Sequence, residues 1–152
     1  MMKRLLPQAN NLDTVIKVFV YACNKINCTQ YDIASFCGFE PRQSAYYLNA
    51  CYYLGLIESN GTISELGKEI LANPSDVKLR VYELIINDVL IGEIFAHMFL
   101  FPADDNKAFA VSWLKKNYPD YSDAVIERRA STLLNWCEEI LCSPLIEYRT
   151  NK

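Results

Sequence analysis

The pattern of polar, apolar and turn-forming residues is most informative within residues 29–66. Thr29 is a good N-cap residue for a short helix over residues 30–36. Gly38 favours a tight turn after that helix, because glycine adopts a left-handed backbone at little cost. Proline suits the first turn of a helix, and it stands at the start of residues 41–54. The region therefore predicts two short helices joined by a turn, which is the layout of a helix-turn-helix motif.

A small hairpin is predicted directly after this motif. Gly55 ends the second helix, and residues 56–59 lead into Asn60 and Gly61. The pair Asn-Gly is the strongest signal for a two-residue hairpin turn, and residues 62–63 supply a short returning strand. A helix-turn-helix followed by such a hairpin predicts a winged helix.

The helix over residues 41–54 is predicted to bury one face and to expose the other. At 3.6 residues per turn the expected buried side chains are Ala45, Leu48 and Tyr52, with Cys51 at the margin. The expected outward side chains are Arg42, Gln43, Tyr46, Tyr47, Ala50 and Tyr53. In the first turn of a recognition helix arginine can pair with guanine and glutamine with adenine. This face therefore predicts contact with duplex DNA, and the alternative is that it packs on a neighbouring element.

The second half of the chain repeats the layout. Residues 75–101 form a long helical region, apolar on nearly all sides, with a possible bend near Asn87. A helix over residues 105–118, a turn with Pro119 and a helix capped by Ser122 follow. Residues 143–148 read as a strand. The predicted fold is mainly α with small β-wings, in which tandem winged helix-turn-helix units pack on a shared helical core. The predicted domains are residues 1–74 and residues 75–152.

The helix that begins after Ser122 also has two predicted faces. Its buried stripe comprises Ile126, Ala130, Leu133, Cys137 and Ile140, and its outward row comprises Arg128, Ser131 and Asn135. Arg129 lies nearer the edge of the core, where its aliphatic stem can pack. Basic side chains gather around this second motif at Lys115, Lys116 and Arg128. Together with Asn60 of the first wing, these basic residues and the outward row complete the set of predicted DNA contacts.

Composition and charge limit the number of domains, the cellular compartment and the expected strength of DNA binding. With 152 residues, of which 51% are hydrophobic, the chain can form one compact domain or two small ones. No apolar run is long enough to cross a bilayer, and the first residues are too short for a secretory signal. We therefore expect a cytoplasmic protein without a membrane partner, whose six cysteines are reduced. The net charge of −3 argues against tight DNA binding by this chain alone, so a weak or assisted contact is expected.

Candidate chemistry is scarce. A zinc site needs four ligands, whereas the sequence offers Cys23 and Cys28, separated by four residues, and a distant His97 in an apolar segment. A single histidine supports no convincing catalytic triad. The charged residues 127–129 and Asp120 resemble a nuclease signature only loosely, because they flank or lie in a helix. We predict no catalytic residues, no metal, no cofactor and no enzymatic activity, and a core position for His97.

Four segments give the chain a resemblance to a known family. They are TVIKVFVYA, DIASFCGFEPRQSAYYLNACYYLGLIE, SELGKEIL and VIERRASTLLNWCEEIL, and they span most of the chain. They resemble the winged-helix accessory domain joined to certain bacterial type II restriction endonucleases and related uncharacterised proteins. The resemblance implies a DNA-binding module, with Arg42, Gln43, Tyr46, Tyr47 and Arg128 as contacts and a separate nuclease domain as partner. No nuclease domain is seen in this sequence, so the resemblance implies either a fragment of a longer enzyme or a free-standing relative.

Two classes of function follow from the sequence. The first is a module that binds double-stranded DNA as the recognition or accessory part of a restriction-modification protein. The second is a module for protein–protein interaction, in which degenerate winged helices hold subunits together, for instance in a homodimer. Salt separates the two, because DNA contact through phosphates weakens steeply as salt rises and an aromatic interface does not.

Overall fold

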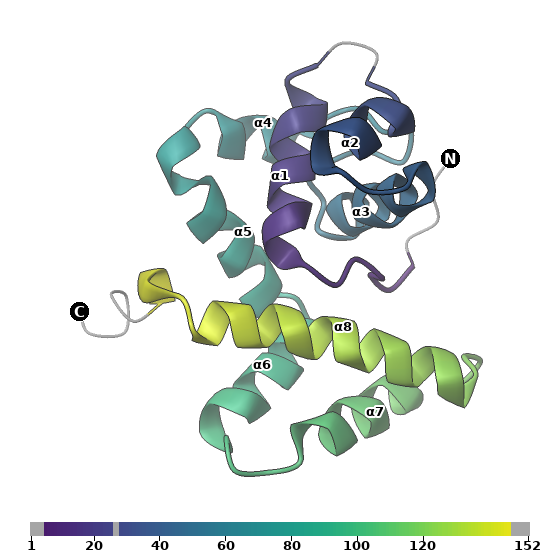
Figure 1. Ribbon diagram of the computed structural model, residues 1–152. Coiled ribbons are helices and arrows are strands. Elements are labelled where there is room, and N and C mark those ends of the chain that lie inside the picture. Colours follow the sequence, from purple (N-terminus) through teal and green to yellow (C-terminus); the bar gives the residue numbers. More distant parts are fainter. Residues whose placement is uncertain (1–4, 26–27, 147–152) are drawn as a thin grey trace. The chain divides into compact units, whose positions relative to one another are not determined.

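The computed structural model describes residues 5–25 and 28–146, and these residues form an all-helical fold (Figure 1). In chain order the elements are α1 (Leu12–Cys23), α2 (Gln30–Cys37), α3 (Pro41–Tyr53), α4 (Glu65–Leu71), the 3-10 turn η1 (Pro74–Asp76), α5 (Val77–Ile86), α6 (Ile91–Leu100), α7 (Asn106–Asn117) and α8 (Asp123–Leu141). Within the described ranges no strand is present, and no helix is long and apolar enough to cross a membrane.

The chain divides into two compact units, an N-terminal unit (Met1–Val81) and a C-terminal unit (Tyr82–Lys152). The division falls inside α5, whereas the sequence placed it after residue 74. The predicted helical region over residues 75–101 is interrupted, because α5 ends at Ile86 and α6 begins at Ile91. Asp88 stabilises this break, since its carboxylate accepts hydrogen bonds from the backbone N–H groups of Leu90 and Ile91.

In the N-terminal unit α1, α2 and α3 contact one another around an apolar centre (Figure 1). Its fully buried side chains include Val15, Phe19, Ile33 and Leu56. The predicted helices over residues 30–36 and 41–54 are confirmed, with small differences at their ends. The sequence located them well because their signals are local: a capping box at Thr29, Gly38 at a φ of 76° and proline at the start of α3.

The predicted first wing is wrong as a pair of strands. Ile57 and Ile63 form one antiparallel bridge, and Glu58 donates a backbone hydrogen bond to Thr62 at 2.7 Å. The turn is one residue longer than the Asn-Gly pair predicts, because Gly61, at a φ of 91°, donates to the carbonyl of Glu58. The ladder cannot lengthen, since α3 ends just before it and α4 begins just after it.

In the C-terminal unit α6 contacts α7 and α8, and α7 also contacts α8. The helices predicted over 105–118 and after Ser122 are confirmed, and the Ser122 hydroxyl accepts a hydrogen bond from the N–H of Val125 at 3.2 Å. Trp136 is fully buried in α8. The second predicted strand is wrong, because residues 144–146 are helical. The last two positions of that prediction, Glu147 and Tyr148, lie outside the described residues.

Candidate nucleic-acid interface

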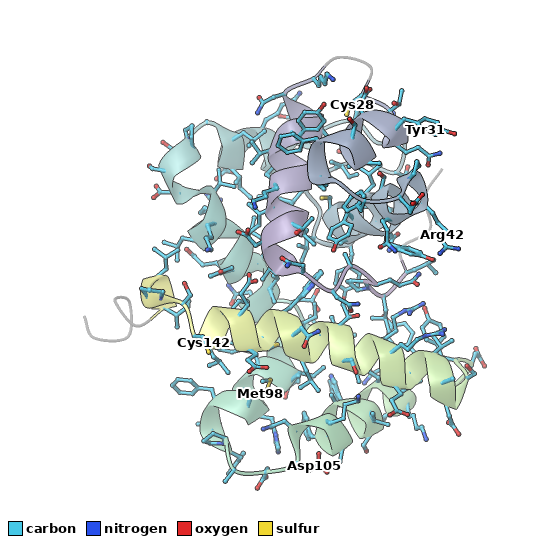
Figure 2. The ribbon with its side chains drawn as sticks, in the orientation of Figure 1. Cys28, Tyr31, Arg42, Met98, Asp105 and Cys142 are labelled. Carbon is cyan, nitrogen blue, oxygen red and sulfur yellow. The ribbon has the colours of Figure 1, made fainter. Side chains whose placement is uncertain are left out.

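The first turn of α3 presents Arg42, one of the predicted DNA contacts. Arg42 is exposed, and among the residues that the structure describes it has no ion-pair partner. Tyr31, near the start of α2, is exposed as well, and Figure 2 shows both side chains projecting outward from the N-terminal unit. Gln43 and Tyr46 are half-buried beside Arg42. The start of α3 therefore offers a guanidinium, an amide and a phenol on accessible surface.

Tyr47 does not belong to this surface, and its predicted outward position is wrong. It is 8% exposed, and its ring stacks on Phe39 with a centroid distance of 5.3 Å. Burial raises the pKa of its phenol, while a hydrogen bond from the backbone of Asn11 acts in the opposite direction. Its hydroxyl thus serves the fold of the N-terminal unit.

Three further positions of α3 also differ from the prediction. Ala50 and Tyr53 are buried although they were expected outside, and Ala45 is exposed although it was expected inside. Tyrosines stand on all sides of this helix, so its apolar positions do not single out one face. The decisive residue is Ser44, which is fully buried and whose hydroxyl donates to the carbonyl of Gln30 at 2.7 Å. This buried polar side chain links α2 and α3.

The turn after α3 places Asn60 on the surface, as the predicted wing tip requires. Its side-chain oxygen is already used within the turn, where it accepts hydrogen bonds from the N–H of Thr62 at 3.1 Å and from its hydroxyl at 2.7 Å. Asn60 therefore fixes the shape of the turn.

The predicted contacts of the second motif are largely engaged with their own unit. Lys115 pairs with Asp123 at 3.1 Å, and the ammonium of Lys116 lies 6.0 Å from the ring centre of Trp113. Ser131 is half-buried and accepts a hydrogen bond from Lys107 at 2.6 Å.

Arg128 and Asn135 of the same motif are exposed on α8, as predicted. Sequence reasoning missed Lys107, because its bond to Ser131 joins two helices that are distant along the chain.

The charge around the first motif is mixed. Glu40, the N-cap residue of α3, is exposed two positions before Arg42. At the start of α2, hydrogen bonds from the backbone N–H and the hydroxyl of Thr29 lower the pKa of Asp32, which lies 3.8 Å from Lys25. This surface therefore carries no broad positive field, in agreement with the net charge of −3.

Cys23 and Cys28 lie near the start of α2. They line a hollow of about 780 Å³ between α1, α2 and the turn at residues 59–63. Burial, with Cys28 nearby, raises the pKa of Cys23 to about 11, so this thiol is neutral at physiological pH and is a poor nucleophile. Within the described residues no cluster of three or more histidine, cysteine or acidic side chains could hold a metal ion.

His97 is half-buried in the C-terminal unit. Its ring stacks on Phe109 at 3.9 Å, and its Nδ1 lies 2.8 Å from the amide oxygen of Asn106. Its Nε2 lies 3.5 Å from a carboxylate oxygen of Asp104. The packing accounts for a histidine in a mostly apolar helix, at a half-buried position where a core position was predicted.

One comparison with known proteins identifies a family. The family described as Domain of unknown function (DUF7226) matches residues 14–144, which covers most of both units. The chain belongs to this family. No curated protein and no solved structure matches the chain significantly.

Proposed function

We propose that this member of the family binds double-stranded DNA through α2, the turn at Gly38 and α3, acting as a helix-turn-helix. One observation carries the proposal: Arg42 is exposed in the first turn of the second helix, next to Gln43. In helix-turn-helix proteins this turn enters the major groove, where an arginine can donate two hydrogen bonds to guanine. The rigid link between Ser44 and Gln30 supports the proposal, since it holds the two helices at a fixed angle.

The proposed setting is that of an accessory module. The resemblance to the winged-helix domains of restriction endonucleases supports it, and so does the mixed charge, which suits a contact whose affinity is supplemented by another domain or subunit. In this proposal α7 and α8 form a second, degenerate unit of the tandem, and the bridge between Ile57 and Ile63 is a reduced wing. The chain then acts by binding, and cleavage belongs to a separate nuclease domain.

The test is a titration of labelled duplexes of random sequence with the purified chain, followed by fluorescence anisotropy at low and physiological salt. We expect binding that weakens steeply as salt rises, because phosphate contacts release counterions. In a duplex selected from the random pool, Arg42→Ala should cost about 1–3 kcal/mol of binding free energy. Lys68→Ala is the matched control, because Lys68 is an exposed basic residue on α4, outside the proposed interface, where it pairs with Glu65. Equal binding by the Arg42 and Lys68 variants would reject α3 as the reading helix.

Two tyrosine variants test the revised face of α3. Tyr46→Phe should weaken binding to all duplexes by a similar factor, because a phenol at this edge can donate to a phosphate oxygen. Tyr47→Phe should leave binding unchanged and lower the free energy of unfolding by about 1 kcal/mol, the usual contribution of one hydrogen bond. If Tyr47→Phe weakened binding and Tyr46→Phe lowered only the free energy of unfolding, the placement of these two rings would be contradicted.

Protein–protein interaction is the second candidate function, and one observation favours it. Phe99, Leu100 and Phe101 are three consecutive large apolar residues at the end of α6, and all three are exposed. Runs of this kind are avoided on surfaces that face only water, so they mark an interaction site or a liability to aggregation.

A further inference from the structure

The N-terminal unit carries an apolar groove along α1. Two hollows, of about 580 Å³ and 350 Å³, share Ile16, Val20 and Asn24 of this helix as lining. We call the two together the α1 groove. The larger hollow continues onto α2 at Phe36, and the smaller continues to Leu71 at the end of α4.

The floor of the groove is built for apolar contact. Phe36 is 55% exposed, and its ring stacks on Tyr21 with a centroid distance of 4.2 Å and an interplanar angle of 3°. Because the two rings hold each other, Phe36 keeps its orientation although much of its surface faces water. A fixed aromatic ring beside Val20 is the kind of preformed anchor point that binding sites use.

The rim of the groove carries lysines, two of which pair with acidic side chains next to it. Lys17, Lys25 and Lys78 line the two hollows, and no acidic side chain is among the described residues that do so. Lys17 pairs with Asp13 at 3.3 Å, and Lys25 lies 3.8 Å from Asp32. Lys25 also donates a hydrogen bond to the Tyr21 hydroxyl at 2.9 Å. An exposed pair such as Lys17–Asp13 stabilises a fold only slightly, so the Lys17 ammonium can reorient toward an acidic segment that docks beside it.

The C-terminal unit carries a surface of the complementary kind. We call Phe99, Leu100 and Phe101 the α6 tip; they are 55%, 64% and 52% exposed. The tip is followed by Asp104 and Asp105, both exposed. Figure 2 shows Asp105 at the turn between α6 and α7. An apolar tip with acidic neighbours matches an apolar groove with lysines on its rim in both properties.

We propose that the α6 tip of one copy docks in the α1 groove of a second copy. Apolar burial of the tip supplies affinity, and the attraction between the lysines of the rim and Asp104 and Asp105 sets the orientation. The two surfaces differ, so the contact is heterologous and the copies associate head to tail. This inference is independent of the proposed DNA contact, because neither surface includes Arg42.

The test is the mass of the purified chain, measured by size-exclusion chromatography with light scattering across a concentration series that reaches the millimolar range. We expect the average mass to rise with concentration above the 17.5 kDa of one chain. Phe36→Glu removes the groove, and Leu100→Glu removes the tip, so each variant alone should stay monomeric. An equimolar mixture should form a dimer, because one variant keeps an intact tip and the other an intact groove.

Three controls make the outcome decisive. Val89→Glu changes another exposed apolar residue, 89% exposed and outside both surfaces, and should associate like the parent. The variant Lys17→Glu leaves the stacked pair of Tyr21 and Phe36 in place and should weaken association several-fold. Circular dichroism reports whether each variant is folded. A parent chain that stays monomeric, or a mixture of the two single variants that fails to pair, would overturn the proposal.

Discussion

The motif of α2 and α3 and the motif of α7 and α8 share a layout and differ in what their polar side chains do. In the first, Arg42 stands exposed beside a turn that Gly38 and the bond from Ser44 to Gln30 hold in shape. In the second, Lys115 and Ser131 are occupied by Asp123 and Lys107. The difference teaches that a helix-turn-helix layout by itself does not mark a binding surface. The two motifs also differ in where their exposed arginine stands: Arg42 lies in the first turn of α3, whereas Arg128 lies in the second turn of α8.

The largest expected loss of stability comes from emptying a core position in either unit. Trp136→Ala empties a fully buried site in α8 and should lower the free energy of unfolding by about 3–5 kcal/mol, as should Phe19→Ala in α1. Thiol labelling with mass spectrometry tells the units apart. We expect Trp136→Ala to expose the buried Cys137 to reagent while the buried Cys51 stays protected, and Phe19→Ala to do the reverse. Simultaneous exposure of both thiols in each variant would show that the two units unfold as one.

The next effect concerns the serine that links α2 to α3. Ser44→Ala leaves the carbonyl of Gln30 without its buried donor, so we expect a loss of about 1–3 kcal/mol in urea unfolding. Ser131→Ala is the matched change in the other motif, where the site is half-buried and water can replace the bond to Lys107. Ser131→Ala should therefore lower the free energy of unfolding by about 1 kcal/mol or less. If Ser131→Ala lowered the free energy of unfolding more than Ser44→Ala did, the roles assigned to the two serines would be wrong.

A smaller effect follows from the capping box of α2. The folded pKa of Asp32 lies below its unfolded value, so the carboxylate stabilises the fold above the unfolded pKa of about 3.9 and loses this effect as the pH falls through the folded pKa. Urea unfolding from pH 7 to pH 3 should therefore show a difference between the parent and Asp32→Ala that is constant near neutrality and shrinks in acid. Asp120→Ala, in the exposed turn before α8, controls for the loss of one negative charge. If the difference in stability between the parent and Asp32→Ala grew as the pH fell, a lowered folded pKa of Asp32 would be contradicted.

The smallest expected effect is on DNA binding by the second motif. Arg128→Ala makes in α8 the same chemical change as Arg42→Ala makes in α3, and both arginines are exposed. Because the neighbours of Arg128 in its motif are engaged internally, we expect its loss to alter duplex binding by less than about 0.5 kcal/mol, the usual range for surface substitutions. A loss comparable to that of Arg42→Ala would move the proposed interface to α8 or extend it over both motifs.

The sequence was sufficient for the helices whose signals lie in neighbouring residues. Thr29, Gly38 and Ser122 act within a turn or two of themselves, and the elements that they begin or end were located correctly. The short helix α4, which begins at Glu65, was not anticipated. The predicted buried face of α3 was wrong in part, because this helix also buries Ser44, whose hydroxyl bonds to the carbonyl of Gln30 fourteen positions away.

The predicted wings were wrong for a different reason. Asn60 and Gly61 do form a turn, but strands need room for several paired residues on each side. The ends of α3 and α4 leave space for one bridge only. The candidate site was predicted in part, because exposure of Arg42 follows from helical periodicity, whereas the engagement of Ser131 by Lys107 is a long-range event that no local pattern reports.

The closed turn at residues 58–62 is also a site where this fold can tolerate insertions. Its two stems are fixed by the bridge between Ile57 and Ile63 and by the bond from Ser64 to Leu56, while Asn60, Gly61 and Thr62 face water. Residues inserted at such a tip add only the entropy of a longer loop, about 0.6 kcal/mol for each doubling of its length. The position can thus accept a fluorescent label or an epitope without cost to the helices. Among relatives of this chain it is the place where length differences should accumulate first.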